Sequence, residues 1–162
     1  MNLQGKLKKI TKLLLITSII SVPVMAQNKK QTTMEKRIIN PWEWQDKRRY
    51  VQAVEVKSVE STLYVSGQTA ISDEGLSSKE NMKSQLIHAL KNLEKVIGQA
   101  GFENKNIVRL NIYTTSSTEL FDCFDIFQDW ITKNGVKQAT TLFEVKSLFE
   151  TLKVELEATV VK

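Results

Sequence analysis

Hydrophobic and polar residues alternate most regularly at the end of the chain. Over residues 153–160 every second side chain is apolar, which is the period of a β-strand with one buried face. Glu155 and Glu157 therefore share the polar side of this strand. Residues 138–145 are predicted to form a preceding strand, joined to it by a polar turn. Carboxylates on a strand face that also packs are costly unless they are hydrated, hydrogen-bonded or used, so an exposed face and a working site both fit the pattern.

The clearest helix is predicted over residues 77–100. Ser77 and Glu80 have the spacing of a capping box at its start, and Gly101 follows as a C-terminal cap. The apolar residues recur every three or four positions and form one stripe, which we interpret as core: Met82, Leu86, Ala89, Leu90, Leu93, Val96 and Ile97.

A second helix is predicted from Ser116 to about Lys133. Ser116 and Glu119 give another capping box, and Gly135 ends the helix. Its apolar set is Leu120, Phe121, Phe124, Phe127, Trp130 and Ile131.

Four further strands complete the pattern. Residues 37–40 favour a short edge strand, residues 50–57 and 62–68 are predicted to pair as a hairpin, and residues 107–114 alternate again. Gly67, near the end of the third of these strands in chain order, allows the close approach of a ligand or another chain. The predicted fold class is α+β: a mixed six-stranded sheet with two helices packed on one face.

The other face of the predicted sheet is polar. It holds Arg109, Asn111, Tyr113, Glu155 and Glu157. A bare sheet face of this kind is unusual, and a second subunit is a natural cover. We therefore expect a homo-oligomer.

The amino terminus resembles a secretory signal peptide over residues 1–26. Lys6, Lys8, Lys9 and Lys12 form a positive region without an acid, an apolar stretch too short to span a bilayer follows, and a small residue, Ala26, precedes the expected cleavage point. The alternative is an uncleaved amphiphilic anchor. We expect a cleaved leader with no stable membrane anchor, export to the periplasm, a flexible mature terminus over residues 27–36 and one domain over residues 37–162.

Removing the leader changes the charge. The chain has 23 Lys and Arg against 18 Asp and Glu. Four of those lysines lie in the leader, which leaves 19 basic residues against 18 acidic ones. A nearly neutral domain gives little support for a nucleic-acid partner. The run from Lys47 to Arg49 is interpreted as a solvated loop.

Single copies of two residue types limit the chemistry. Cys123 is the only cysteine and His88 the only histidine, so an intramolecular disulfide and a histidine cluster for a metal are both excluded. We expect no cofactor and no metal. Trp42 and Trp44 follow Pro41 on a loop; they are interpreted as a cap on a core or interface, with ligand stacking as the alternative.

Several short segments together resemble the RidA/YjgF family of enamine and imine deaminases. They cover roughly residue 37 to the end and are residues 50–53 (YVQA), 66–68 (SGQ), 90–93 (LKNL), 100–101 (AG), 107–109 (IVR) and 155–158 (ELEA), with residues 40–44 (NPWEW) and 139–142 (ATTL) typical of one branch. The resemblance implies a chorismate mutase-like fold, a homotrimer around a central barrel, and ligand sites in the clefts between subunits.

The resemblance also assigns roles to residues. Glu155 stands where the family has the glutamate that positions the attacking water. Tyr50 matches a tyrosine that lines the cleft, and Ser66 and Gly67 match the segment whose backbone faces the ligand. Thr140 replaces the family's carboxylate-binding arginine, and a threonine offers one hydroxyl and no charge. Thr141 and Leu142 follow it, and Leu142 stands at a family cysteine.

Two functions fit these residues. The first is a Rid-type hydrolase that deaminates small reactive enamines or imines, with Glu155 as the catalytic residue and Arg48, Arg49 or Arg109 as a replacement cation. The second is a non-catalytic trimer that binds a small metabolite through Tyr50, Thr140 and Thr141. An RNA-cleaving activity is disfavoured by the neutral domain and by the lack of a histidine pair.

Overall fold

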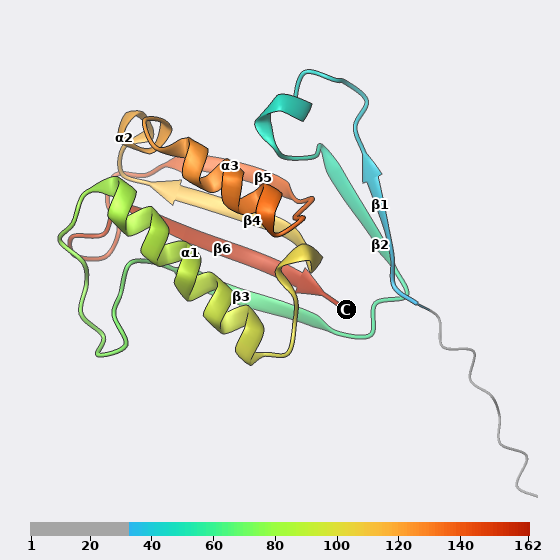
Figure 1. Cartoon of the computed structure of the whole chain (residues 1–162), viewed down its shortest axis with the longest axis horizontal. Coiled ribbons are helices and arrows are strands. Elements are labelled where there is room, and N and C mark those ends of the chain that lie inside the picture. Colours follow the sequence, from blue (N-terminus) through green and yellow to red (C-terminus); the bar gives the residue numbers. More distant parts are fainter. Residues whose placement is uncertain (1–32) are drawn as a thin grey trace, which may run out of the picture. The chain divides into compact units, whose positions relative to one another are not determined.

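A computed structural model describes residues 33–162 of the chain, and the predicted signal peptide lies outside them. The described strands are β1 (Glu35–Ile39), β2 (Ala53–Lys57), β3 (Thr62–Gln68), β4 (Ile107–Thr114), β5 (Ala139–Glu144) and β6 (Val154–Val161). The helices are α1 (Met82–Gln99), α2 (Ser117–Phe121) and α3 (Phe124–Lys133), with short 3-10 turns at Asp46–Arg48 and Asn104–Asn106 (Figure 1). The predicted α+β class is confirmed.

The strands form two sheets in the described part of the chain, where the prediction had one. Four strands follow the order β3-β6-β4-β5, in which β4 and β5 run parallel and the other pairs antiparallel. Strands β1 and β2 make a separate antiparallel pair. The predicted hairpin of β2 with β3 is therefore wrong, because β2 pairs with β1 and β3 pairs with β6. Alternation in a strand specifies its faces and leaves its partner open.

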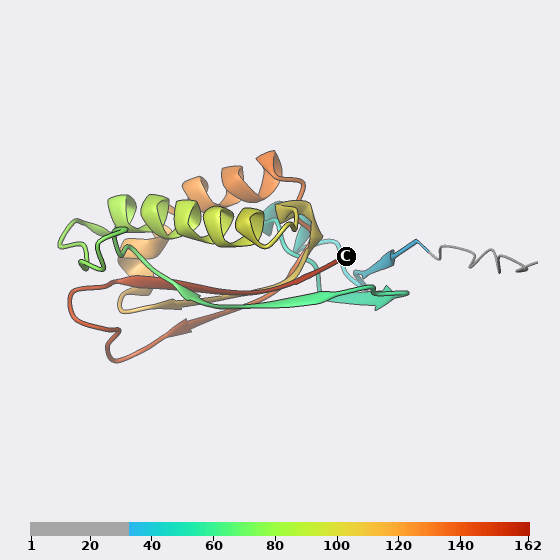
Figure 2. The same cartoon turned by 90° about the horizontal axis from the view of Figure 1, so that it is seen from below.

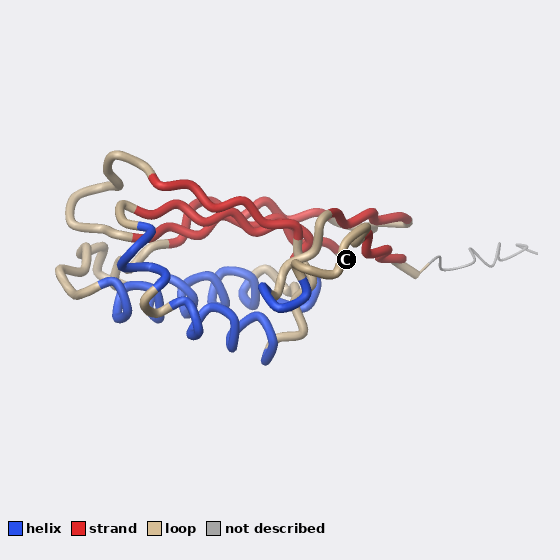
Figure 3. Tube along the Cα trace, turned by 90° about the horizontal axis from the view of Figure 1, so that it is seen from above, coloured by secondary structure: helices blue, strands red, loops and turns tan. Residues whose placement is uncertain are grey.

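Both long helices cover the same face of the four-stranded sheet, as predicted (Figure 2; Figure 3). The stripe on α1 is buried against β3 and β6, with Leu86, Leu93 and Ile97 at most 1% exposed. They meet Leu110 and Leu156 from the sheet. Each such side chain contributes about 1.5–3 kcal/mol of hydrophobic stabilisation, so this layer fixes how the sheet lies.

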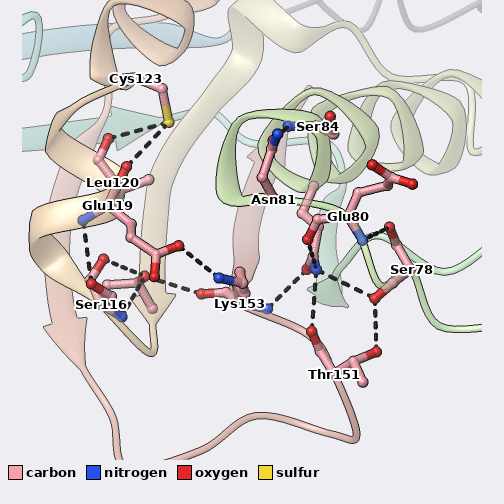
Figure 4. A network of polar contacts seen from close by, with 12 residues as sticks. Ser78, Glu80, Asn81, Ser84, Ser116, Glu119, Leu120, Cys123, Thr151 and Lys153 are labelled. Atoms are coloured by element: carbon pink, nitrogen blue, oxygen red, sulfur yellow. Dashed lines mark hydrogen bonds and ion pairs between the residues drawn. The ribbon is translucent and has the colours of Figure 1, made fainter.

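The first helix begins later than the capping box indicated. Asn81 is the N-cap, and its side chain accepts from the amide of Ser84 at 3.0 Å (Figure 4). Ser77 instead forms an isolated bridge with Ile71. Asparagine is as strong an N-cap as serine, so Asn81 can cap the helix in place of the predicted Ser77. Gly101 follows the helix with a φ of 73°, as its assignment as a cap requires.

The second predicted helix divides into α2 and α3 around Asp122 and Cys123. Ser116 caps it as predicted, since it accepts from the amide of Glu119 at 3.2 Å. The Glu119 side chain does not complete the capping box and instead forms an ion pair with Lys153 at 2.7 Å (Figure 4). That ion pair ties α2 to the start of β6.

A polar cluster holds the start of β6, two residues before Glu155. Gln85 is 1% exposed, and its Nε2 donates to the carbonyls of Ser78, Glu80 and Thr151 at 3.0–3.3 Å. Its Oε1 accepts from the Lys153 amide at 2.9 Å. Thr151 also donates to the Ser78 carbonyl at 2.7 Å (Figure 4). Satisfied buried networks are rigid, so the backbone that carries Glu155 is well fixed.

The first strand begins two residues before the predicted edge strand. Glu35 and Lys36, assigned to the flexible segment by the sequence, pair with Lys57 and Val56. The remainder of that segment, residues 27–32, lies outside the described residues. None of the helices within residues 33–162 is both long and apolar enough to cross a lipid bilayer.

Candidate functional site

Glu155 lies directly against Gly67. A Cβ placed on Gly67 would be 1.7 Å from the Glu155 Oε1 and 2.4 Å from its Cδ. No side chain fits there while the carboxylate keeps its position. The sequence had assigned this glycine to the approach of a ligand or another chain; in the described residues the group that approaches is the carboxylate of Glu155.

A β-bulge shapes the strand beneath this carboxylate. Val65 pairs with Ala158 and Gln68 with Leu156, so β3 holds one extra residue between these two pairs. Ser66 and Gly67 occupy the bulge and are exposed. Bulges re-aim side chains beside functional sites, and here the bulge includes Gly67, which lies next to Glu155.

The two glutamates of β6 have different surroundings. Glu157 accepts from the Tyr113 hydroxyl at 2.8 Å and from the Asn111 amide at 3.2 Å. These bonds, the tyrosine's first, hold the pKa of Glu157 below its ordinary value, and the same contact raises the pKa of Tyr113. Glu155 is half-buried and makes no hydrogen bond or ion pair within residues 33–162. Its oxygens are left to bind a water or a ligand.

A second group of predicted residues lies on the helix side of the sheet. Tyr50, Thr140 and Leu142 line a cavity of about 540 Å³ between β4 and β5 on one side and α2 and α3 on the other. Its other lining residues are Arg48, Ile112, Phe121, Phe124, Phe127, Gln128 and Gln138. The amide of Val51 donates to the Gln138 carbonyl at 3.0 Å, which brings the neighbouring segment with Arg48 and Tyr50 beside β5.

Two residues that line this cavity each carry a buried polar atom with no partner within the described residues. Gln138 is fully buried; its Nε2 donates to the Arg49 carbonyl at 3.3 Å, and its Oε1 is unbonded. The Oγ1 of Thr140 is also buried and unbonded. An unsatisfied buried polar atom costs about 1–3 kcal/mol, so a ligand that bonds these atoms gains by relieving that cost.

Thr141 belongs to the opposite face. Its register partner is Asn111, and its Oγ1 accepts from Arg109 at 3.2 Å. Thr140 pairs instead with Leu110 on the helix side. Two of the candidate replacement cations also lie on opposite faces of the sheet: Arg48 lines the cavity, and Arg109 lies on the polar face with Thr141.

A single chain does not bring the two halves of the predicted site together. Glu155 pairs with Tyr113 on the polar face, while Thr140 faces the helices. Successive residues of a strand point to opposite faces. An arrangement that uses both Glu155 and Thr140 on one ligand therefore needs a second copy of the chain.

Sequence reasoning did not place seven of the ten lining residues in a cavity, and five of these seven matter most for its chemistry. Phe121, Phe124 and Phe127 were predicted only as members of the apolar set of the second helix; Phe127 is buried, but Phe121 is 58% exposed. Their spacing of three along the helical segment was the available signal. Arg48 was assigned to a solvated loop, and its guanidinium lies 5.2 Å from the centre of the Trp44 ring. Nothing in the sequence marked Gln138.

The aromatic loop is open in a single chain. Trp42 and Trp44 are 55% and 53% exposed, so neither caps this chain's own core. They stack at 6.1 Å, and Trp44 meets Tyr50 edge-on at 6.4 Å. An interface or ligand role for the two tryptophans stays a prediction.

The thiol and the possible metal-ligating side chains are the other candidates for a reactive centre. Burial raises the pKa of the Cys123 thiol, which disfavours the nucleophilic thiolate. Within residues 33–162, no three metal-ligating side chains gather into a possible metal site.

Comparisons with known proteins identify relatives in sequence and in fold. The profile of the family described as Endoribonuclease L-PSP matches residues 43–162. A RutC family protein of Aquifex aeolicus (strain VF5) is 34% identical over 113 residues, which cover 70% of this chain and 88% of the relative. Among solved structures, the Rid-family protein YyfB of Yersinia pestis superposes with a TM-score of 0.70 at 26% identity, covering 78% of this chain and 98% of that one. The YjgF gene product of E. coli has a TM-score of 0.58 at 22% identity over 70% of this chain and 87% of its own, which supports the fold alone.

Proposed function

The chain belongs to the RidA/YjgF (Endoribonuclease L-PSP) family, and on that premise we propose that it is a hydrolase that deaminates small enamines or imines to carbonyl compounds and ammonia. The observation that supports this most is the Glu155 carboxylate. It is half-buried, held against the backbone of Gly67, and has no hydrogen bond or ion pair within the described residues.

The proposed reaction uses that carboxylate as a general base and then as a general acid. Glu155 takes a proton from a water as the water oxygen bonds to the imine carbon, and the C=N double bond becomes a single bond. The carboxylic acid then returns this proton to the nitrogen, which gives a carbinolamine. Glu155 next takes the hydroxyl proton of the carbinolamine and passes it to the nitrogen, so that the C–N bond breaks, ammonia leaves and the carbonyl forms. A carboxylate within hydrogen-bond reach of a water suits both steps. An enamine first gains a proton at carbon and loses one from nitrogen to the solvent, which converts it to the imine.

We further propose that the working site forms between two copies of the chain. Glu155 comes from one copy, and the cavity with Tyr50 and Thr140 comes from the other. The motivating fact is that these groups lie on opposite faces of the sheet in one chain. A closed ring of identical subunits repeats one heterologous contact, so a homotrimer would hold three equal sites.

The direct test follows the loss of 2-aminoacrylate and 2-iminopropanoate generated by a dehydratase. The chain should accelerate their hydrolysis, and Glu155→Gln should remove the acceleration because an amide cannot take the proton. Glu157→Gln is the matched control, since it removes the same charge two residues along the strand. No acceleration over buffer with any imine would reject the proposal, and a fully active Glu155→Gln would remove this residue from the mechanism.

One observation favours a second candidate, a non-catalytic binding protein. Gln138 and Thr140, which line the cavity, carry unbonded polar atoms, and Thr140 has no charge at the position where the family resemblance implies an arginine. In that case small metabolites would raise the thermal midpoint by binding the native state, and no imine would be turned over. Turnover that depends on Glu155 would exclude it.

A further inference from the structure

The cavity on the helix side has a lining that suggests which compounds it admits. Resting on the proposed function, we propose that it selects imines derived from amino acids with an aromatic side chain, and that Arg48 binds their carboxylate in place of an arginine at position 140. The inference depends on the size of the cavity, its apolar wall, its unbonded polar atoms and the position of its single cation.

The size and the apolar wall suit a ring. The volume of about 540 Å³ falls in the range of roughly 300–1,000 Å³ that is typical of small-molecule sites. A dry cavity of about 150 Å³ lined by Leu, Ile and Phe is enough for benzene. Ile112 and Phe127 are at most 2% exposed and form the floor. Phe124 contacts Phe127 at 5.2 Å and Phe121 at 5.7 Å between ring centres, so aromatic rings extend from the floor to the mouth.

The unbonded atoms require a donor on the ligand. Gln138 turns its Nε2 to the Arg49 carbonyl, so the free atom is its carbonyl oxygen, which only accepts. The Thr140 hydroxyl can accept as well. An imine or enamine N–H therefore fits this part of the cavity, and an apolar compound without a donor would leave the atoms unsatisfied.

The charge of the site comes from Arg48. Among the residues that line the cavity it is the only charged one. It is exposed at the mouth, and its guanidinium is held over Trp44 at 5.2 Å. A planar guanidinium binds a carboxylate with two parallel bonds. A ligand with its ring on the floor and its N–H near Gln138 would direct its carboxylate toward this mouth.

Binding is tested first, without turnover. The probes are L-phenylalanine, which carries a ring, a carboxylate and N–H donors, L-alanine, which lacks the ring, and phenylpyruvate, which lacks the donor. Calorimetry should give L-phenylalanine an affinity at least about tenfold above either of the others. Equal affinities for L-phenylalanine and L-alanine would overturn the inference.

Two matched pairs of variants locate the binding. Phe121→Ala should lower the affinity for L-phenylalanine several-fold and leave the affinity for L-alanine unchanged. Phe149 is 65% exposed and does not line the cavity, so Phe149→Ala should change neither affinity. Arg48→Gln should weaken both amino acids about tenfold, and its neighbour control Lys47→Gln should not. If Phe121→Ala leaves L-phenylalanine binding intact, or if Arg48→Gln and Lys47→Gln behave alike, the assignment is wrong.

A catalytic assay separates this inference from the proposed function. An L-amino acid oxidase, using oxygen, supplies the imines of phenylalanine and alanine, and their hydrolysis is followed with and without the chain. A higher kcat/KM for the phenylalanine imine, lowered by Phe121→Ala, supports both. Equal acceleration of both imines overturns the aromatic selectivity and leaves the deaminase. Selective binding of L-phenylalanine with no acceleration of either imine rejects the deaminase activity and supports the selectivity of the cavity for aromatic ligands.

Discussion

Replacing Gly67 by alanine tests whether the position of the Glu155 carboxylate matters. The added Cβ would lie 1.7 Å from Oε1, and an ordinary contact begins near 3.4 Å, so the oxygen must retreat by about as much again. The obstructing atoms are the far end of a flexible side chain, so the Glu155 side chain can turn away while the backbone stays in place. The substitution therefore displaces the carboxylate by about 1.7 Å and removes no atom from it.

The expected effect on stability is small and the effect on rate is large. Gly67 is not among the glycines with positive φ, so its backbone accepts alanine. Alanine also restricts the unfolded chain, which raises the free energy of unfolding by about 0.4–1 kcal/mol. Moving Glu155 to a poorer rotamer costs about 0.5–1.5 kcal/mol, and the two effects nearly offset. A misplacement of about 1 Å costs on the order of a hundredfold in rate, so we expect imine hydrolysis to fall at least that much.

Gly98→Ala is the control, because an added Cβ there has no neighbour within 4 Å. That change should stabilise α1 by about 0.5–1 kcal/mol and leave the rate unchanged. The double variant Gly67→Ala/Glu155→Gln should be no slower than Glu155→Gln alone, because both changes disable one group. A Gly67→Ala enzyme that keeps the full rate while Glu155→Gln is inactive would refute the geometric argument.

Two further predictions concern stability. Asn81→Ala should lower the free energy of unfolding by about 1 kcal/mol in a denaturant titration, because it removes the N-cap of α1. Ser77→Ala should lower it less. A larger loss for Ser77→Ala than for Asn81→Ala would show that Ser77 is the cap. The bonds from Tyr113 and Asn111 depress the pKa of Glu157, so their stabilisation is present above the ordinary glutamate value of about 4.3 and is lost as the pH falls through the lower folded-state value. The thermal midpoint of Glu157→Gln should therefore lie below that of the parent chain at neutral pH and approach it in acid, and a difference that stays constant to pH 3 would contradict this.

The sequence predicts best where one pattern has one physical solution. The alternation around Glu155 and Glu157 fixed strand β6 and the face of both carboxylates, since a buried face permits a single register. Six of the seven residues in the predicted stripe on α1 are buried and Val96 is partly buried, whereas the buried Gln85 was not predicted. The partner of β2 was not predictable, because its alternation fits β1 and β3 equally. The break of the second helix at Cys123 also carries no glycine or proline as a signal.

The candidate site was predicted in pieces. The family resemblance supplied Tyr50, Gly67, Thr140 and Glu155, and the structure shows that they form two groups. The contact between Gly67 and Glu155 depends on the bulge in β3, which the residue pattern does not mark. Gln138 was missed because a glutamine at the first position of a predicted strand looks like a surface residue. It is buried where the Arg48–Tyr50 segment packs beside β5.

The measurement that tests the account most directly is activity in mixed oligomers. Glu155→Gln removes the base, and Thr140→Tyr fills the cavity from the opposite face of the sheet; each should be inactive alone. After the two variants are unfolded, mixed in equal amounts and refolded together, about a quarter of the contacts in a ring should join an intact cavity to an intact Glu155, and activity should return to roughly that fraction of the parent's. Mixed oligomers that form and stay inactive would show that each chain must supply both halves, which would contradict a site shared between copies.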